Sequence, residues 1–288
     1  MYDTILLPTG GGPGTDEATA RALDLARTFD AAVHALYVVD SRSSRDGDVE
    51  AVRHALEERG DAATAAVRDR AAQLDLDVVR GDREGVPYRA ILDYAGENGV
   101  DLVVMATRSR TGTPDHHLGS TTERVLVRSD VPVLTTPLDG ETAVPETRYG
   151  TYDRVVIPTD GSDTAERAAE HGLAVAERYG ADVRVVYVVD TTTYGLEDAP
   201  RSIVGLLKEG GQGAVEAIAD EARERNLSAS TAVLRGAPED AILQYANGAA
   251  ADVIAMGTRG RGGFDEHFLG STAGRVVRRS NVPVLTVS

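Results

Sequence analysis

Two halves of this sequence repeat each other from end to end. Similar segments recur at an offset of 150 residues, which becomes 151 in the later part of each half. A unit this long is typical of a globular domain, because solenoid repeats span only about 20–50 residues. The sequence therefore predicts two copies of one domain. The matching segments are 2–9 with 152–159, 35–40 with 185–190, 118–121 with 269–272, and 131–135 with 282–286.

The composition excludes several classes of protein. No apolar run approaches the ~18–20 residues of a membrane span, and the first residues lack the pattern of a secretory signal. Cysteine is absent, which excludes disulfides, thiolate metal sites and cysteine nucleophiles. We therefore expect a cytoplasmic protein that makes no membrane contact.

The charge balance is strongly acidic. Asp and Glu number 46 against 30 Lys and Arg, for a net charge of −16, and Lys208 is the only lysine. Such a surface argues against nucleic-acid binding, which depends on basic side chains neutralising phosphates. Acidity with so little lysine predicts a halophilic protein adapted to molar salt. The alternative is an ordinary acidic protein whose lysine content follows genome composition.

Strands and helices are expected to alternate along each repeat. This order predicts an α/β fold of two tandem doubly wound, five-stranded parallel sheets of Rossmann-like type. We place the first domain at 1–138, a linker at 139–150 and the second domain at 151–288. The second repeat is predicted to contain strands at 155–157, 183–189, 230–234, 252–256 and 282–287, a helix capped by Ser162 or Asp163, and helices at 213–225 and 238–247.

Ligands of such sheets bind beyond the carboxyl ends of the strands, where the strand order reverses. In the second repeat the loop after the first strand contains Asp160. The loop after the fourth strand runs from Gly257 to Gly260, and nine residues later Gly270 and Ser271 open the last helix. Glycines let backbone N–H groups approach phosphate oxygens, and a helix N-terminus attracts anions. These loops therefore predict a phosphate site.

The pattern Gly-x-x-Gly, nine residues, then Gly-Ser resembles the ATP-binding signature of the universal stress protein (UspA-like) family. The resemblance covers nearly the whole chain, strand by strand. It implies the adenine nucleotide alpha hydrolase-like fold of that family, whose sheets pair through their last strands. It also implies ATP as the ligand, with Mg²⁺ on its phosphates.

Carried over by position, the resemblance assigns roles in the second repeat. It places Asp160 near the ribose, Val188 at the adenine and Met256 in the pocket wall. The remaining positions belong to the first loop or surround the ribose and phosphates: Pro158, Thr159, Gly257, Arg259, Gly260, Gly270, Ser271 and Thr272. Ser271 and Thr272 have an alternative role as helix caps, which requires no ligand. Gly270→Val is expected to clash with phosphate and to leave the sheet intact.

The first repeat departs from this pattern at the ligand positions. Gly10 replaces Asp160, Ala106 replaces Gly257 and Ser109 replaces Gly260. The ribose carboxylate is thereby lost, and two Cβ atoms intrude where backbone should approach phosphate. We expect one ATP site per chain, in the second repeat. Two sites and none are the alternatives.

The sequence predicts an ATP-binding stress-response regulator with little or no catalysis. It contains no convincing nucleophile–base pair, and the histidines at 116, 117 and 267 lack the spacing of a metal site. A slow ATPase or self-phosphorylating enzyme is one alternative, and a nucleotide-free interaction module is the other. We expect an unidentified protein partner and a pseudo-dimer within the chain through strands 131–135 and 282–287. Further homodimerisation is left open.

Overall fold

The computed structural model describes residues 1–11, 15–41, 49–107, 118–137, 152–192, 201–260 and 268–288. The chain forms two compact units, Met1–Gly150 and Thr151–Ser288. The predicted linker at 139–150 and the three histidines at 116, 117 and 267 lie outside the described residues. Each unit is considered by itself below.

The first unit is a parallel sheet in the order β3-β2-β1-β4-β5. The order reverses between β1 and β4, which is the switch point of a doubly wound sheet. Its strands are β1 (Thr4–Pro8), β2 (Ala32–Asp40), β3 (Val78–Gly85), β4 (Leu102–Ala106) and β5 (Val133–Thr136), and its helices are α1 (Thr15–Phe29), α2 (Val49–Ala72), α3 (Pro87–Glu97) and α4 (Ser120–Arg128).

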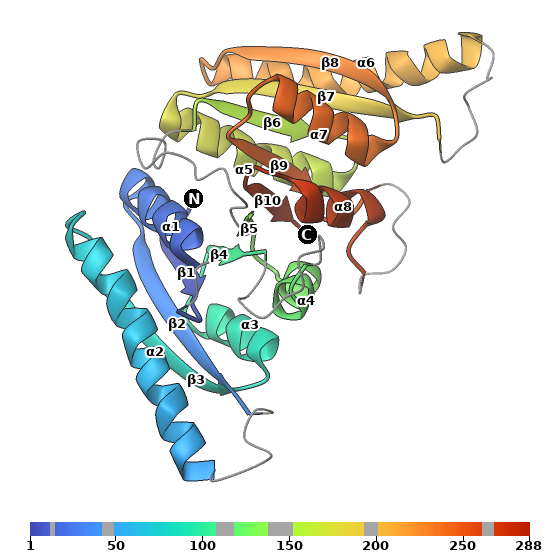
Figure 1. The fold of residues 1–288 in the computed structure, drawn as a ribbon. Coiled ribbons are helices and arrows are strands. Elements are labelled where there is room, and N and C mark those ends of the chain that lie inside the picture. The colour runs from blue at the N-terminus through green and yellow to red at the C-terminus, as the bar shows by residue number, and fades with distance from the viewer. Residues whose placement is uncertain (12–14, 42–48, 108–117, 138–151, 193–200, 261–267) are drawn as a thin grey trace. The chain divides into compact units, whose positions relative to one another are not determined.

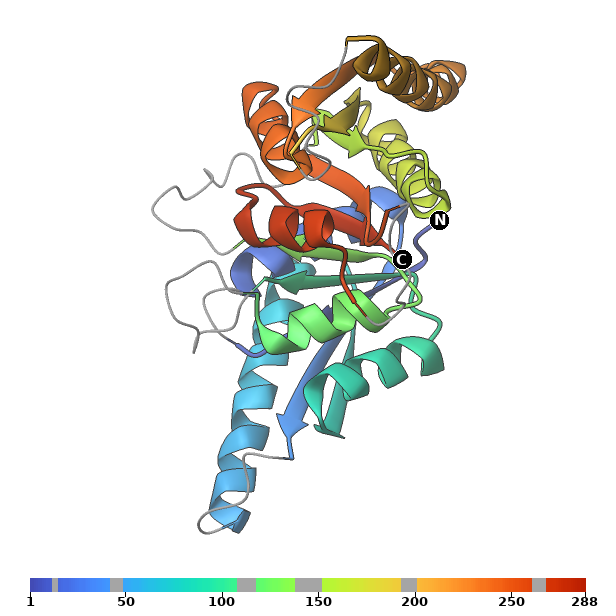
Figure 2. The same cartoon turned by 90° about the vertical axis from the view of Figure 1, so that its right-hand side faces the viewer.

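The helices of this unit cover both faces of its sheet. Right-handed crossovers place α1 and α2 on one face while the chain moves outward from β1 to β3. After β3 the chain returns to the centre, and α3 and α4 pack side by side on the other face (Figures 1 and 2). Within the described ranges, no helix combines the length and apolar character needed to cross a membrane.

The second unit repeats this plan with the order β8-β7-β6-β9-β10, again parallel. The predicted doubly wound, five-stranded fold is therefore confirmed in both repeats. Its strands are β6 (Arg154–Pro158), β7 (Asp182–Asp190), β8 (Ala229–Gly236), β9 (Val253–Gly257) and β10 (Val284–Val287), and its helices are α5 (Asp163–Tyr179), α6 (Arg201–Glu224), α7 (Pro238–Gly248) and α8 (Ser271–Arg279).

Most predicted boundaries of the second repeat lie within two residues of the observed ones, and one is wrong by more. The helix expected at 213–225 is α6, which begins much earlier, at Arg201. Glycines at 205, 210 and 211 lower the helix propensity of this segment. Gly211 has a packing reason to be glycine, since a Cβ there would run into the ring of Tyr187 on β7. Packing against the sheet thus outweighs local propensity.

In each unit an aspartate just before β4 or β9 accepts hydrogen bonds from the backbone at the start of the neighbouring strand, β1 or β6. In the first unit, Asp101 Oδ2 accepts hydrogen bonds from the backbone N–H groups of Asp3 and Thr4, at 2.8 and 2.9 Å. In the second unit, Asp252 Oδ2 accepts from those of Asp153 and Arg154, both at 2.9 Å. Both repeats therefore join their two central strands by the same pair of hydrogen bonds, which we call the aspartate clasp.

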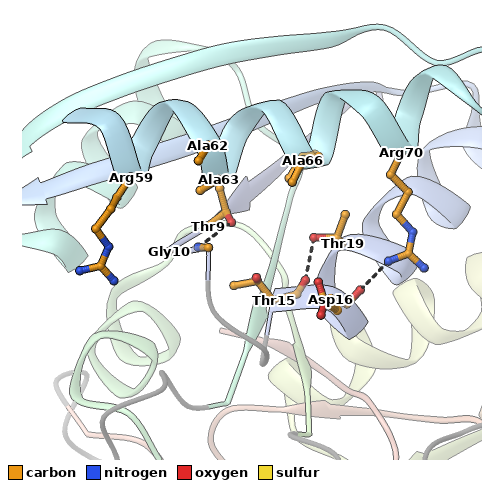
Figure 3. Close-up of a pocket in the computed structure, with 12 residues that line it drawn as sticks. Thr9, Gly10, Thr15, Asp16, Thr19, Arg59, Ala62, Ala63, Ala66 and Arg70 are labelled. Carbon is orange, nitrogen blue, oxygen red and sulfur yellow. Dashed lines mark hydrogen bonds between the residues drawn. The ribbon is translucent and has the colours of Figure 1, made fainter. Parts of the chain in front are cut away.

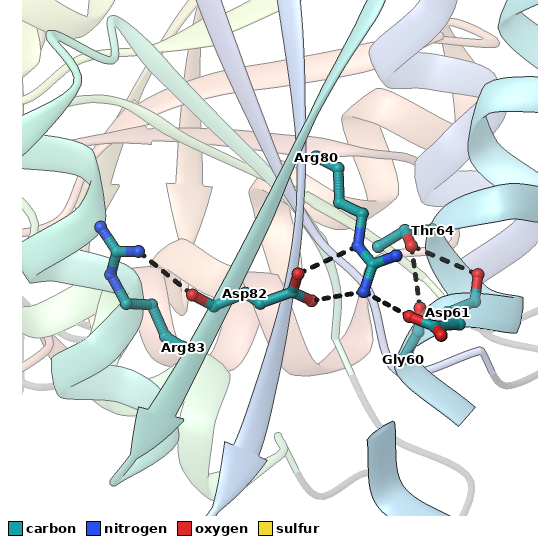
Figure 4. Close-up of polar contacts among 6 residues, drawn as sticks. All are labelled: Gly60, Asp61, Thr64, Arg80, Asp82 and Arg83. Carbon is teal, nitrogen blue, oxygen red and sulfur yellow. Dashed lines mark hydrogen bonds and ion pairs between the residues drawn. The ribbon is translucent and has the colours of Figure 1, made fainter. Parts of the chain in front are cut away.

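The outer strand β3 is covered with charge. Arg80 donates two hydrogen bonds to the Asp82 carboxylate, at 3.0 and 3.2 Å, and pairs with Asp61 on α2 (Figure 4). The equivalent positions of β8 hold Thr231 and Val233 instead. Charged side chains on an outer strand discourage pairing with other chains, so the two repeats protect this side of the sheet differently.

Candidate functional site

The candidate site begins at three neighbouring strand ends. In the second unit β6 lies between β9 and β7. Pro158 ends β6 and pairs with Val186, so Val188 lies two residues further along β7. Met256 lies near the end of β9, where it is 6% exposed, whereas Val188 is half-buried. The three strands thus bring these predicted residues to one edge of the sheet.

The first loop is organised around Asp160. Asp160 Oδ1 accepts hydrogen bonds from the backbone N–H of Ser162 at 3.1 Å and from its hydroxyl at 2.6 Å. The Ser162 Oγ also accepts from the N–H of Ala165 at 3.3 Å, which confirms Ser162 as the N-cap of α5. Gly161 has a φ of +71°, a left-handed conformation that glycine adopts without steric cost. The carboxylate is therefore fixed where the loop enters the helix.

A hydrogen bond joins this loop to the one after β9. The Thr164 hydroxyl donates to the carbonyl oxygen of Arg259 at 2.7 Å. A Cβ on Gly257 would lie 3.1 Å from that same carbonyl oxygen, and a Cβ on Gly260 would run into the Asp160 carboxylate. Both signature glycines therefore permit the close approach of the two loops.

The N-terminus of α8 completes the site. The N–H of Gly270 donates to the Thr258 carbonyl oxygen at 2.9 Å. Gly270 is the N-cap of α8 and offers no side-chain cap. Ser271 and Thr272 lie inside the first turn, so the alternative that they cap the helix is wrong. A glycine N-cap leaves the first-turn N–H groups without a side-chain acceptor, as an anion site requires.

The substitution Gly270→Val does not isolate a phosphate contact, contrary to our expectation from the sequence. A Cβ on Gly270 would lie 2.8 Å from the Thr258 carbonyl oxygen. Such a contact forces the loop itself to move. Loss of binding in this variant would therefore follow from a distorted loop as readily as from a clash with ligand.

Comparison with known proteins identifies the family. The model of the universal stress protein family matches residues 1–137 and again residues 151–288. The chain belongs to the universal stress protein family. Universal stress protein MJ0531 of Methanocaldococcus jannaschii is 40% identical over 139 residues, which are 47% of this chain and 82% of that relative.

Other members of the universal stress protein family match more of the chain. Universal stress protein Mb2346c of Mycobacterium bovis is 32% identical over 218 residues, 68% of this chain and 67% of its own length. A crystal structure of a universal stress protein from Archaeoglobus fulgidus covers 99% of this chain and 96% of its own, at a TM-score of 0.72 and 23% identity, and so shares the fold. Another member, solved in complex with cAMP, covers 48% of this chain and 98% of its own at 27% identity and a TM-score of 0.35.

The first repeat of this universal stress protein keeps the same loop framework. Thr9 N–H donates to the Leu36 carbonyl oxygen at 2.8 Å, as Thr159 does to Val186 in the second repeat. Gly119 N–H likewise donates to the Thr107 carbonyl oxygen at 2.8 Å. The backbone geometry around the strand ends is therefore retained, and the repeats differ in their side chains.

Two residues of this framework were missed by the sequence reasoning. Ser162 was considered only as a helix cap, and Thr164 was not considered at all. The repeats themselves carry the signal, because Asp160, Ser162 and Thr164 are all replaced by glycine in the first repeat, at positions 10, 12 and 14. The first repeat thus lacks the Thr164 hydroxyl that joins the two loops and the Asp160 and Ser162 side chains that fix the first loop. Ser109, which replaces Gly260, lies outside the described residues.

Proposed function

We propose that this universal stress protein binds ATP, with Mg²⁺ on its phosphates, in the second repeat. It acts as a nucleotide-dependent stress-response regulator with little or no catalysis of its own. The observation that carries the proposal is the meeting of three elements: the fixed Asp160 carboxylate, the glycine loop after β9 and the uncapped start of α8. A carboxylate suits ribose hydroxyls, and a helix N-terminus suits phosphate.

The residues present fit an adenine nucleotide. The first turn of α8 has no side-chain cap, so its N–H groups can bind phosphate. Ser271 is exposed in the first turn of α8 and adds a hydroxyl donor, while the half-buried Arg259 adds a cation. Val188 and Met256 supply apolar surface at the neighbouring strand ends, suited to a base.

The proposal assigns no ATP to the first repeat. Gly10 provides no carboxylate for the ribose. Ala106 places a methyl group where the second repeat has Gly257. We therefore propose a single site per chain.

The test is a calorimetric titration of the full chain with ATP, in molar KCl with Mg²⁺ and after removal of co-purified nucleotide. The informative variants are Asp160→Asn, which keeps an acceptor for Ser162 but removes the charge, and Arg259→Gln. Each should weaken ATP binding about tenfold or more, since a charge-assisted hydrogen bond contributes roughly 1.5–3 kcal/mol. Arg108→Gln, at the matching position of the first repeat, is the control and should bind normally.

Two sites per chain would show that the first repeat tolerates Gly10 and Ala106, and would overturn the single-site proposal. No binding would favour the nucleotide-free interaction module. Steady phosphate release, or phosphate incorporated into the protein, that disappears in Asp160→Asn would favour the slow ATPase or self-phosphorylating enzyme.

We also propose that the strands at 131–135 and 282–287 pair within one chain as a pseudo-dimer. The resemblance supports this arrangement, because single-domain relatives pair through their last strands, and pairing covers an otherwise open edge. Sedimentation should then find the full chain monomeric and the isolated fragment 151–288 dimeric. A monomeric fragment would contradict the proposal.

The acidic composition supports a further proposal, that the protein works in a cytoplasm of molar salt. A chain with a net charge of −16 and a single lysine repels itself at low ionic strength, and this repulsion destabilises the compact state. The proposed regulatory role includes a protein partner that binds the nucleotide-bound state. We expect the surface of that partner to tolerate molar salt as well.

A further inference from the structure

The first repeat contains a pocket of its own between α1 and α2 (Figure 3). Its volume is about 480 Å³, which lies within the range of small-molecule sites. It opens beside the first loop of this repeat, at Thr9, Gly10 and Gly11. It shares this loop with the position of the nucleotide site proposed for the second repeat, because Thr9 and Gly10 match Thr159 and Asp160. It extends elsewhere from there, along α1 and α2, since Val38, Met105 and Ala106, which match Val188, Met256 and Gly257, do not line it.

Two arginines of α2 mark the ends of this pocket. Arg59 and Arg70 are separated by 11 residues of helix, or about 16 Å along its axis. In Figure 3 both side chains extend from the same side of the helix, and that of Arg70 reaches Asp16 in the first turn of α1. Arg59 makes no hydrogen bond or ion pair with any residue that the structure describes. Arg70 donates only a 3.4 Å hydrogen bond to the backbone oxygen of Asp16.

The wall between the arginines is small and apolar. Ala62, Ala63 and Ala66 face the pocket from α2. Opposite them, the Thr19 hydroxyl donates to the Thr15 carbonyl oxygen at 2.6 Å and is thereby satisfied within α1. The only acidic side chain among the lining residues is that of Asp16, near Arg70. The pocket therefore offers a cation at each end and an apolar middle.

The second repeat serves as an internal control. Its α6 aligns with α2 through Gly60 and Gly211, each of which packs against a tyrosine ring of the neighbouring strand. In this alignment Arg59 corresponds to Gly210 and Arg70 to Glu221. Both cations are thus particular to the first repeat, in a chain with a net charge of −16. The fold alone does not require them.

We propose that this pocket binds a small organic molecule with two anionic groups, a phosphate or carboxylate at each end of an apolar centre. Arg59 binds one anionic group and Arg70 the other, because guanidinium groups form paired, charge-assisted hydrogen bonds with such oxyanions. The apolar centre lies on Ala62, Ala63 and Ala66. The first repeat is then a second ligand-binding domain with a chemistry different from that of its twin.

The test is a calorimetric titration of the full chain at fixed KCl with hexanediol bisphosphate, hexyl phosphate, decanedioate and decanoate. The bisphosphate should bind about tenfold more tightly than hexyl phosphate, because only it can engage both arginines. Decanedioate spans the same number of bonds between its anionic groups, so comparison with it distinguishes phosphate from carboxylate as the preferred group. Arg59→Gln and Arg70→Gln should each reduce the affinity for the preferred two-ended ligand about tenfold and abolish its advantage over the matching one-ended ligand.

Matched variants keep the test specific. Arg68→Gln removes an exposed cation of the same helix that does not line the pocket, and it should bind normally. Ala66→Leu fills the pocket without changing its charge and should abolish binding in a protein that remains folded by circular dichroism. Arg259→Gln should leave binding of the two-ended ligand unchanged. No binding, equal affinity for one-ended and two-ended ligands, or an equal loss in Arg68→Gln would overturn the proposal.

Discussion

The side chains of Asp160, Ser162 and Thr164 stabilise the meeting of two loops in the second repeat. Thr164 provides the hydrogen bond between them, to the Arg259 carbonyl oxygen at 2.7 Å. The first repeat has glycine at the matching position 14, and its Thr122 hydroxyl instead joins α4 to the end of β4, donating to the Ala106 carbonyl oxygen at 3.0 Å. The two hydroxyls thus make different connections in the two repeats.

Thr164→Val removes this hydrogen bond while keeping the side-chain shape. We expect a loss of about 1 kcal/mol in the free energy of unfolding, the usual net contribution of one such bond. ATP affinity should also fall, because Arg259 is no longer held in place. Thr122→Val is the matched control: a similar loss of stability on chemical denaturation, with ATP binding unchanged. Equal effects of the two variants on ATP affinity would contradict this assignment.

His34 on β2 makes a pH-dependent contribution to the free energy of unfolding. Its Nδ1 lies 3.0 Å from the hydroxyl of Tyr94 on α3, and burial lowers the pKa of His34 below its ordinary value of 6.5. The folded state therefore favours neutral His34, and between the two pKa values the unfolded chain binds more protons. Stability from this group is complete above pH 6.5 and falls as the pH drops below that value.

His34→Gln should flatten the pH dependence of the free energy of unfolding between about pH 5 and pH 7, where histidine changes charge. Denaturant melts of both proteins across this range measure the effect. An unchanged slope would show that His34 has the same pKa in the folded and unfolded states.

At the level of elements, each long helix has a glycine in its interior where it packs closely against a strand of the sheet. A Cβ on Gly60 of α2 would lie 2.5 Å from the ring of Tyr37 on β2, and Gly211 of α6 meets Tyr187 in the same way. Glycine in a helix interior costs roughly 1 kcal/mol relative to alanine. The close helix–strand packing offsets that cost.

Two neighbouring glycines of α6 separate these effects. Gly211→Ala should destabilise the protein by about 1–3 kcal/mol, because the new methyl group overpacks against the tyrosine ring. Gly210→Ala should stabilise it by about 0.5–1 kcal/mol, since a Cβ there meets nothing within 4 Å. Thermal and denaturant unfolding measure both. Similar shifts in the two variants would contradict the packing argument.

The same helices show which parts of the fold could be predicted from the sequence. Strand runs such as 183–189 are apolar and β-branched, so their type and their parallel order follow from pattern and alternation. The start of α6 at Arg201 could not be predicted, because glycines lower the helix propensity of this segment and the packing of Gly211 against Tyr187 of β7 becomes visible only in the folded structure. In the site, glycine spacing predicts the loops, whereas the Thr164 bond depends on two segments far apart in sequence.

For the whole molecule, we expect the net charge to determine how stability depends on salt. At −16 the folded chain repels itself, and salt screens this repulsion over a Debye length of about 10 Å at 0.1 M and about 3 Å at 1 M. We expect the melting temperature to rise by roughly 5 °C or more between about 0.1 M and 1 M KCl. Differential scanning calorimetry measures it, and an unchanged or lower melting temperature would contradict adaptation to high salt.

The aspartate clasps are a part of the fold that both copies of the duplicated domain keep. Asp101 and Asp252 close the amino ends of the two sheets with the same pair of hydrogen bonds. The proposed ATP site lies at the opposite, carboxyl end of the second sheet, where Asp160 corresponds to Gly10 of the first repeat. The hydrogen bonds at the amino ends are therefore kept in both repeats, far from the loops whose residues differ. A duplicated domain can thus change its loop side chains while the bonds that join its central strands stay the same.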